Sequence, residues 1–387
     1  MGVSASPIPL AGKISFVKNG HAEGTATVGL GSLRTDEHGR LIVVGSKGES
    51  QSPLNRPISN FANNDGWYDD VADGPVTATV QIRRAAPVAV QVPAWVVVVP
   101  PSYAPGIDNV TTWFDQAESL DAWFFNPMLQ TLKPSFTRHI YPVLKRTVLL
   151  QWVEEDARNV HGNGKPFDFL ASTWFDALKD NSNASQSKRM TVLGALAVPL
   201  EVAPGPPGPR NMPDLNRGLN PARPWETIPT TLTRLQYERM RKWANGDFVA
   251  DWTGVPVPVS IDNIPLAQQP AALTRAALEG CIGSPFYPGI ESTYIMAQPQ
   301  TYEGAYRIRR TLPPGYLTEF MALPWQADFD ACGDLWWPAQ RPVSVRLPNG
   351  TFADFARGVT SMVTQWSGLG FIVPHENVYQ EEERTLP

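Results

Sequence analysis

Cysteine is scarce in this chain, whose 387 residues include two, Cys281 and Cys332. Two thiols cannot build the disulfide framework that holds small secreted domains together, so that class of fold is excluded. Long apolar stretches are missing as well. The apolar run at residues 95–99 is far shorter than the roughly 20 residues that a membrane-spanning helix needs. We therefore expect no membrane partner.

Targeting signals and surplus positive charge are also missing. The first residues, MGVSASP, lack the basic start and the apolar core of a signal peptide. We therefore expect a cytoplasmic protein, with secretion by a non-classical route left open. Because 32 Lys and Arg face 37 Asp and Glu, the formal net charge is −5. This balance gives no broad attraction to phosphates, and no nucleic-acid partner is expected.

Proline, in contrast, is abundant, with 38 residues beside 30 glycines. Each proline fixes φ and removes a backbone donor, so this density predicts short elements joined by long ordered loops. The hydrophobic content of 42% is enough for a sizeable core. We predict an α+β fold with small antiparallel sheets, several short helices and extensive Pro/Gly-rich coil.

The densest proline segment, PGPPGP at 204–209, is stiff and marks a predicted boundary. It separates an N-terminal β-rich and helical part (1–203) from a C-terminal part (204–387). A coil that wraps over one continuous domain would have the same composition, so both interpretations stay open.

Alternating apolar and polar residues predict several strands. Residues 22–46 form a predicted hairpin that turns at 36–39. Residues 77–82 alternate, and residues 95–99 are typical of a fully buried strand that two prolines end. A further strand is predicted at 191–200.

Apolar residues at helical spacing predict helices, and their aromatic residues are expected to form core. The predicted helices are 110–133 (one helix, or two broken at Pro127), 165–179, 231–245 and 270–279. The last of these begins at Pro270, and Gly280 stands where a C-terminal glycine cap belongs. Cys281 is therefore expected just beyond a helix end.

Aspartates crowd the segment 63–74, in which four of them follow Asn63-Asn64. Carboxylate oxygens in such a loop could hold a cation such as calcium. The spacing does not match an EF-hand, and the turn and cap chemistry of Asp and Asn is the favoured interpretation.

The two cysteines lie in the most distinctive part of the sequence. It opens with CIGSPFYPGIE at 281–291 and closes with LPWQADFDACGDLWWPAQRP at 323–342. These motifs resemble the oxidases that build cysteine tryptophylquinone from their own side chains, the lysine ε-oxidase and glycine oxidase family. Further signatures are NNDGWYDD at 63–70, DGPVTATV at 73–80 and AWVVVVPP at 94–101. The resemblance thus covers most of the chain.

The resemblance implies a cofactor in which a tryptophan carries two added oxygens and a thioether to a cysteine. Cys281 matches the thioether cysteine, and the modified tryptophan matches Trp336 or, less well, Trp337. The product carbonyl accepts a primary amine, as in other carbonyl cofactors. A carboxylate base then removes the α-proton, and burial raises the pKa of such a base usefully.

Residues around these motifs are candidates for the remaining roles. Arg341 could orient a substrate carboxylate through a bidentate pair. The acid–base candidates are Asp328, Asp330, Glu291 and Asp334, and the pocket-lining candidates are Tyr287, Tyr294 and Tyr316. Each has a plainer interpretation: a lone cysteine is usually a small buried hydrophobe, tryptophans beside proline often only pack, and Cys281 could pair with Cys332.

The chain also departs from the family pattern. Members carry an aspartate one helical turn before the cofactor cysteine, where this chain has Ala277. The nearest carboxylate, Glu279, would point off another helix face. Tyr316 stands where a carboxylate would be expected, and the chain is much shorter than typical members.

Two functions from different classes follow. The first is an oxidase of a primary amine or amino acid that releases ammonia and hydrogen peroxide and is matured by a flavoprotein partner; a homo-oligomer is compatible with it. The second is a cofactor-free relative that binds a ligand or partner. A metal-binding structural protein that uses the aspartates at 65–73 is a weaker third, and no metal is expected in the oxidase site. Visible absorbance separates the first two, because ordinary tryptophan does not absorb there.

Overall fold

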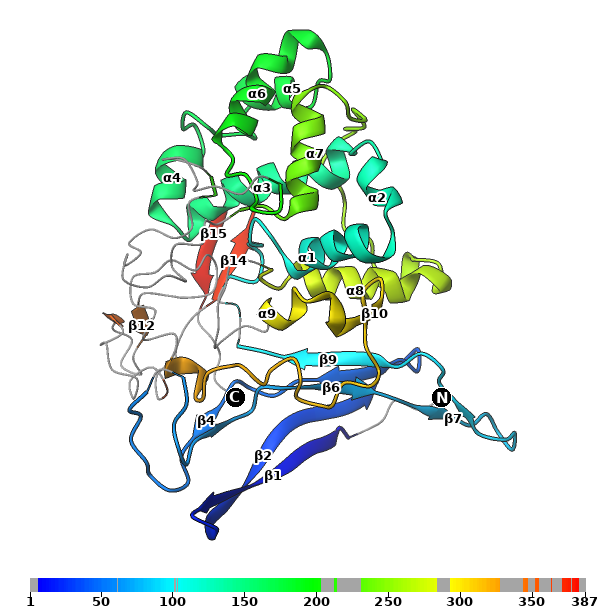
Figure 1. The fold of residues 1–387 in the computed structure, drawn as a ribbon, viewed down its shortest axis with the longest axis vertical. Helices are drawn as coiled ribbons and strands as arrows, with labels where there is room; N and C mark the ends of the chain where they lie inside the picture. Colours follow the sequence, from blue (N-terminus) through cyan, green and yellow to red (C-terminus); the bar gives the residue numbers. More distant parts are fainter. Residues whose placement is uncertain are drawn as a thin grey trace.

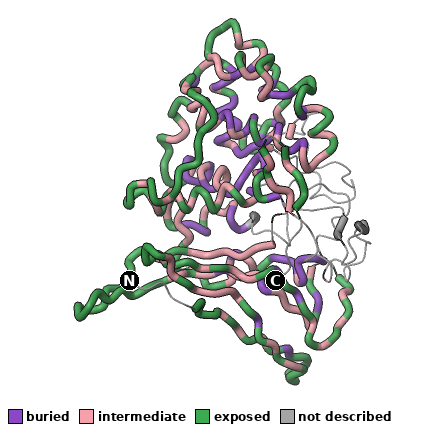
Figure 2. The backbone as a smooth tube through the Cα atoms, turned by 180° about the vertical axis from the view of Figure 1, so that it is seen from behind, coloured by how far each residue is buried: buried purple, intermediate pink, exposed green. Residues whose placement is uncertain are grey.

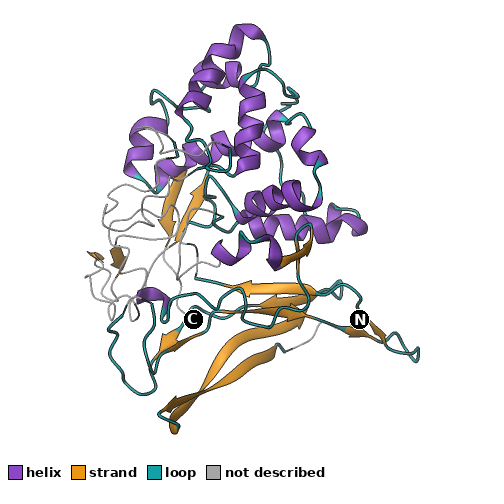
Figure 3. Ribbon diagram, viewed as in Figure 1, coloured by secondary structure: helices purple, strands orange, loops and turns teal. Residues whose placement is uncertain are grey.

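The structure is a computed structural model, and Figure 1 shows its fold. It describes residues 6–60, 62–100, 102, 104–202, 212–213, 231–283, 293–327, 344–346, 352–354, 363, 371–376 and 378–382. In these ranges the fold is α+β, as predicted. Most of the small antiparallel sheets lie below a helical half, and the strand pair at 371–375 and 378–382 lies beside the helices (Figure 3). The predicted boundary at 203/204 falls outside the described residues and stays a prediction.

The strands are short apart from the first two. They are β1 (Ile8–Lys18), β2 (His21–Thr35), β3 (Leu41–Val44), β4 (Ser50–Gln51), β5 (Tyr68–Asp69), β6 (Ala72–Val76), β7 (Thr79–Val80), β8 (Val88–Ala89), β9 (Ala94–Val98), β10 (Tyr302–Gly304), β11 (Arg307–Ile308), β12 (Ser344–Arg346), β13 (Phe352–Asp354), β14 (Phe371–His375) and β15 (Val378–Glu382).

The β1-β2-β3 sheet is antiparallel throughout. The predicted hairpin at 22–46 is confirmed as β2 and β3, with Thr35 opposite Leu41. Strand β1, which the turn Asn19-Gly20 joins to β2, was not predicted from the sequence. Both turn residues have positive φ, 50° and 80°, which is the type I′ geometry that Asn-Gly favours in tight hairpins.

The strand predicted at 95–99 is β9, which pairs with β6 from Ala72↔Val98 to Val76↔Ala94. The prediction of full burial is wrong, since Trp95–Val98 are half-buried in a two-stranded ribbon. Of the predicted strand 77–82, only Thr79–Val80 form β7.

The helices are also short. They are α1 (Trp113–Leu120), α2 (Met128–Thr131), α3 (Tyr141–Leu149), α4 (Glu155–His161), α5 (Ser172–Leu178), α6 (Gln186–Ala195), α7 (Arg234–Ala244), α8 (Gln269–Glu279) and α9 (Thr293–Met296). The predicted segment 110–133 is the two-helix alternative. α1 continues into a π-helical turn at Asp121–Phe125, and the break before α2 lies at Asn126 and Pro127. In the predicted helix 165–179, α5 covers only the second half.

The strand predicted at 191–200 is wrong, because residues 191–195 belong to α6 and Leu196 forms only an isolated bridge with Met212. Its β-branched residues favoured a strand locally, but tertiary packing decides the outcome. The fully buried Arg189 donates from Nε to the Trp243 carbonyl at 3.1 Å, and Val192 joins the core. These contacts fix α6 as a helix against α7.

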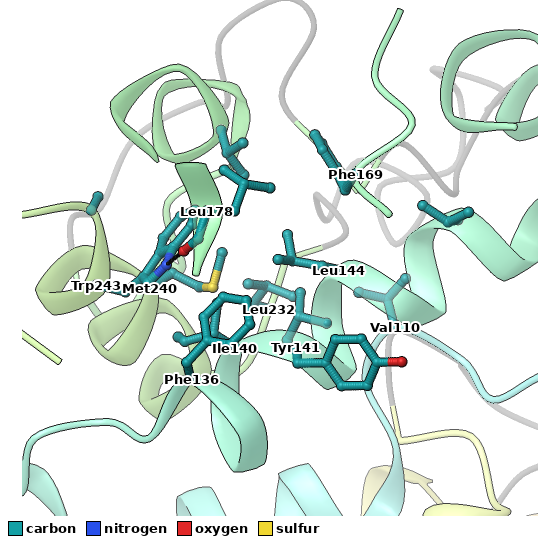
Figure 4. Packing of buried hydrophobic residues seen from close by; sticks show 14 of the residues in the cluster. Val110, Phe136, Ile140, Tyr141, Leu144, Phe169, Leu178, Leu232, Met240 and Trp243 are labelled. Atoms are coloured by element: carbon teal, nitrogen blue, oxygen red, sulfur yellow. Dashed lines mark hydrogen bonds between the residues drawn. The ribbon is translucent and has the colours of Figure 1, made fainter. Parts of the chain in front are cut away.

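The main core lies in the helical half of the molecule. Figure 2 shows buried residues gathered there, and Figure 4 shows how side chains from α3, α5 and α7 interlock. Phe136, Ile140, Leu144, Met240 and Trp243 are almost fully inaccessible. Among the described helices, none combines the length and hydrophobicity needed to span a membrane.

Candidate active site

Cys281 emerges from the C-terminus of α8, as the sequence predicted. Gly280 caps the helix, and the Cys281 N–H donates to the Leu278 carbonyl at 3.3 Å. The thiol Sγ donates to the Ala277 carbonyl, also at 3.3 Å. Ala277 itself is exposed, so its backbone rather than its side chain faces the sulfur. Cys281 is a free thiol.

The segment 281–283 is clamped to the N-terminus of α1. The Cys281 carbonyl accepts from the Trp113 N–H at 3.0 Å, and the Gly283 N–H donates to the Thr111 carbonyl at 3.0 Å. Between them, Ile282 and Thr112 form an antiparallel bridge. A Cβ on Gly283 would lie 2.0 Å from the Thr112 carbonyl oxygen, so the two backbones meet where only glycine fits.

Helix α1 is itself firmly held. Its N-cap is Thr112, in a capping box with Asp115. The Asp115 carboxylate also accepts from the buried Arg146 of α3 at 2.7 Å. Arg239 of α7 makes a bidentate pair with Glu118, at 2.5 and 2.9 Å. Helices α3 and α7 thus hold α1, the helix against which the Cys281 segment lies.

An apolar cluster surrounds the thiol. Its buried members are Trp113, Leu120, Ile295, Met296, Tyr302 and Leu317, and Cys281 packs against them with Trp95, Val97, Leu278, Ile308 and Tyr316. Burial raises the pKa of the Cys281 thiol to about 11. The sulfur is therefore a neutral thiol in a water-poor setting.

Tyr316 reaches the same cluster through Asp73. One Asp73 oxygen accepts from the Thr318 N–H at 3.0 Å and hydroxyl at 2.8 Å. The other accepts from Trp95 Nε1 at 2.9 Å. The Gly315 N–H donates to the Asp73 carbonyl at 2.9 Å. Asp73 thereby ties the loop that carries Tyr316 to β6 and β9, a positioning role that the sequence analysis missed.

The cation alternative for the 63–74 aspartates finds no support. Asp70 accepts from the N–H groups of Lys47 and Gly48 at 3.0 and 3.1 Å, and Asp73 binds donors as above. In the part of the chain that the structure describes, no three His, Cys, Asp or Glu side chains are grouped to hold a metal. The contacts are those of turn and cap chemistry.

Most of the other predicted site residues lie outside the described ranges. These are Trp336, Trp337, Asp328, Asp330, Asp334, Glu291, Tyr287, Arg341 and Cys332. Tyr294 lies in α9, and only its backbone is described. Of the predicted set, the structure brings together Cys281 and Tyr316, and the remaining roles stay predictions.

Asp69 is a half-buried residue next to Trp325, and the Oδ2 atom of its carboxyl is fully buried. It pairs with Ser50 across β4–β5, and the Ser50 hydroxyl donates to Gln326 Oε1 at 2.8 Å. The Trp325 N–H donates to the Asp69 carboxyl. Within the described residues, Asp69 Oδ2 and Gln326 Nε2 are buried without a partner. Burial, with a smaller contribution from neighbouring Asp70, raises the pKa of Asp69 to about 7.

Asp69→Asn is expected to change how stability depends on pH. Because the folded pKa exceeds the unfolded value of 3.8, the native state binds more protons from about pH 4 to 7. The free energy of unfolding therefore falls as pH rises through this window. The variant lacks this loss and should gain about 3 kcal/mol in the free energy of unfolding on the wild type between pH 4.5 and pH 8, at 1.36 kcal/mol per pKa unit.

Urea titrations at the two pH values measure this difference. Asp65, exposed in the same loop, provides the matched control as Asp65→Asn, which should track the wild type. If the free energy of unfolding depends on pH in the same way in the wild type and in Asp69→Asn, the pKa of Asp69 is not raised in the folded protein.

Comparison with known families gives the context of this site. Residues 6–98 match the L-lysine epsilon oxidase N-terminal family model. Residues 214–349, which include α7, α8 and Cys281, match the L-lysine epsilon oxidase C-terminal domain. Together the two matches cover more than half of the chain. The protein belongs to the L-lysine epsilon oxidase family.

Within this family, one curated relative is the L-lysine 6-oxidase of Marinomonas mediterranea, 26% identical over 476 aligned positions. The match takes in 89% of this family member and 62% of the relative, so the chain spans about 62% of that relative's length.

Solved structures show the same fold. The epsilon-lysine oxidase from Marinomonas mediterranea matches 92% of this chain and 68% of its own, with a TM-score of 0.67 and 22% identity. The Schiff base intermediate of L-Lys epsilon-oxidase from the same organism, with L-Lys, matches 97% and 73%, with a TM-score of 0.66 and 20% identity. The family architecture is thus retained in the shorter chain.

Proposed function

We propose that this protein is a quinone-dependent oxidase that oxidatively deaminates a primary amine or amino acid. The observation that carries the proposal is the placement of Cys281. The chain is a member of the L-lysine epsilon oxidase family. Its Cys281, which matches the thioether cysteine of the cofactor, is a free, neutral thiol. It is clamped to α1 and faces an apolar cluster.

The surroundings of Cys281 fit a thioether-linked cofactor. The sulfur makes one weak hydrogen bond, to the Ala277 carbonyl, so a covalent bond to an indole would leave no buried donor unpaired. Cysteine tryptophylquinone formed with Trp336, or with Trp337, would supply the electrophilic carbonyl for the amine. The expected products are ammonia and hydrogen peroxide.

The chain's own residues have assigned roles in this proposal. The apolar cluster keeps water from the sulfur, and Tyr316 lines the same region. The proposed acid–base carboxyls are Asp328, Asp330 and Glu291, with Tyr287 and Tyr294 lining the pocket and Arg341 orienting a substrate carboxylate. A flavoprotein partner is proposed for maturation.

The substrate class follows from the relatives. These relatives are named as oxidases of L-lysine, which makes an amino acid with a primary amine the first substrate to test. Family membership also favours the oxidase over the cofactor-free alternative.

The proposal predicts selectivity for primary amines. Without oxygen, a primary amine should bleach the visible absorbance of the mature protein, and readmitted oxygen should restore it with release of peroxide. Secondary and tertiary amines should do neither, because a productive condensation with a carbonyl requires a primary amine.

This selectivity is tested on protein coexpressed with its flavoprotein partner. Spectra are recorded with L-lysine, with lysine monomethylated at both amines, and with lysine dimethylated at both amines. An equal response to the three amines would show that the chemistry is not carbonyl-based.

A further inference from the structure

A polar pocket of about 170 Å³ lies where α1, α3, α7 and α8 meet. In Figure 1, α8 lies below α1, while α3 and α7 lie above it. Every residue that lines the pocket belongs to the described part of the chain, and four of them are the arginines Arg138, Arg146, Arg239 and Arg275. A cavity of about 150 Å³ is large enough for benzene, so the pocket has room for a small molecule of similar size.

The inner wall of the pocket consists of two ion pairs. Arg146 donates to Asp115, and Arg239 donates to Glu118, as described above. The four side chains are only 6% to 16% exposed. Each guanidinium group thus has a carboxylate of its own, and neither carboxylate is left to hold a cation.

Arg275 forms part of the outer wall. It donates from Nε to Glu279 at 2.8 Å, and its guanidinium carbon lies 4.9 Å from the centroid of the Phe114 ring. Both contacts hold the guanidinium group in place. Its two terminal NH₂ groups make no hydrogen bond to a residue that the structure describes, so they can donate to a ligand.

Arg138 and His139 lie side by side in the π-helical turn Phe136–Ile140, which precedes α3. Within the described ranges, the Arg138 side chain has no ion pair and no hydrogen bond. Nδ1 of His139 accepts from the Ser135 N–H at 2.9 Å. The proton of the neutral ring is therefore on Nε2, which is a further donor without an acceptor among the described residues.

The pocket carries a surplus of positive charge. Burial lowers the pKa of His139 to about 4, and the charge of Arg239 acts in the same direction. Arg275 and Arg138 add smaller contributions of the same sign, while Glu118 opposes them. His139 is therefore neutral, and four guanidinium groups against three carboxylates leave one positive charge without a counterion in the lining.

We propose that this pocket binds a small oxyanion, a carboxylate or a phosphate, through Arg138, Arg275 and the Nε2–H of His139. Guanidinium groups match the oxygens of carboxylate and phosphate in geometry and bind them with charge-assisted hydrogen bonds. The anion neutralises the surplus charge, and His139 adds a donor without adding a second charge.

The site is separate from the proposed oxidase chemistry, in which none of these residues has a role. Its walls nevertheless include α1, to which the Cys281 segment is clamped, and α8, which ends just before Cys281. A ligand that binds the native state and not the unfolded chain stabilises the fold. A bound anion should therefore raise the melting temperature.

Calorimetric titration of the full chain tests the site, with inorganic phosphate and succinate as separate probes and sodium chloride keeping the ionic strength constant. The wild type is expected to bind at least one probe saturably, one anion per chain, with a Kd of about 1 mM or lower. Arg138→Ala should weaken this binding by about 10-fold or more, because it removes a charge-assisted hydrogen bond.

Two further variants sharpen the test. His139→Asn can keep an acceptor for the Ser135 N–H but lacks the Nε2–H, and it should weaken binding by about 3- to 10-fold. Arg84→Ala is the matched control, because Arg84 is also an exposed arginine without an ion pair in the described ranges and lies outside the pocket. It should leave Kd unchanged, and circular dichroism spectra should show that all three variants fold.

The two probes identify the source of the anion. Binding of phosphate alone would assign the site to phosphate, and binding of succinate alone would assign it to a carboxylate. The proposal is overturned if neither probe binds saturably, or if Arg138→Ala binds as tightly as the wild type, which would place the anion elsewhere.

Discussion

Cys281→Ser is expected to abolish the visible absorbance and the amine-dependent release of peroxide while leaving the fold intact. Serine is close to cysteine in size, and its hydroxyl can keep the hydrogen bond to the Ala277 carbonyl. It cannot form a thioether to an indole, so the proposed cofactor cannot be completed. A visible spectrum, a peroxidase-coupled assay and a thermal melt measure the three properties.

The chain provides its own control for this variant. Cys332 is the second cysteine, and Cys332→Ser should retain both absorbance and activity. If Cys332→Ser loses the absorbance while Cys281→Ser keeps it, the assignment of the thioether cysteine is wrong.

Gly283→Ala is expected to disconnect Cys281 from α1. The added Cβ would lie 2.0 Å from the carbonyl oxygen and 2.2 Å from the carbonyl carbon of Thr112. These are backbone atoms at the N-cap of a helix held by the Asp115–Arg146 pair, so they cannot move aside cheaply. The bridge between Thr112 and Ile282 should open, at a cost of about 3 kcal/mol in the free energy of unfolding.

The functional consequence should be larger than the loss of stability. When the bridge opens, Cys281 leaves the apolar cluster, and we expect most of the cofactor absorbance to disappear even in the folded fraction. Denaturant titration and the absorbance per folded protein separate the two effects.

Gly280→Ala is the matched control for this prediction. Its added Cβ would meet its nearest atoms at 3.8 and 3.9 Å, and Gly280 has an ordinary helical φ of −77°. Alanine should therefore be tolerated there. If Gly283→Ala behaves like Gly280→Ala, the contact with α1 does not position Cys281.

The features that the sequence predicted best are those set by neighbouring residues. Helices α7 and α8 have caps and apolar spacing within a dozen residues, and both were predicted within a few residues of their bounds. The turn between β2 and β3 is likewise local. For the same reason, the glycine cap at Gly280 correctly predicted that Cys281 lies just past a helix end.

The features that the sequence missed depend on contacts between distant segments. No local pattern links Ile282 to Thr112, or Thr318 to Asp73. The helical state of 186–195 depends on the buried Arg189, which reaches the carbonyl of Trp243. Propensity alone could not foresee this outcome.

In the candidate site, too, some features could be predicted from the sequence and others depend on the folded structure. The family resemblance identified Cys281 and Tyr316, and the structure places both against one apolar cluster. The raised pKa of Asp69 was not foreseen, because it comes from burial in the folded protein, with a smaller contribution from the neighbouring Asp70. The aspartate motif at 63–70 contained the residue, but its local spacing suggested only turns.

Peptide mass mapping tests the central claim most directly, on protein from its native host or coexpressed with the proposed flavoprotein partner. The account predicts that the tryptic peptide of Cys281 is joined to that of Trp336, with two added oxygens, and fragmentation would distinguish Trp336 from Trp337. Recovery of both peptides separate and unmodified from such protein would contradict the quinone-dependent oxidase.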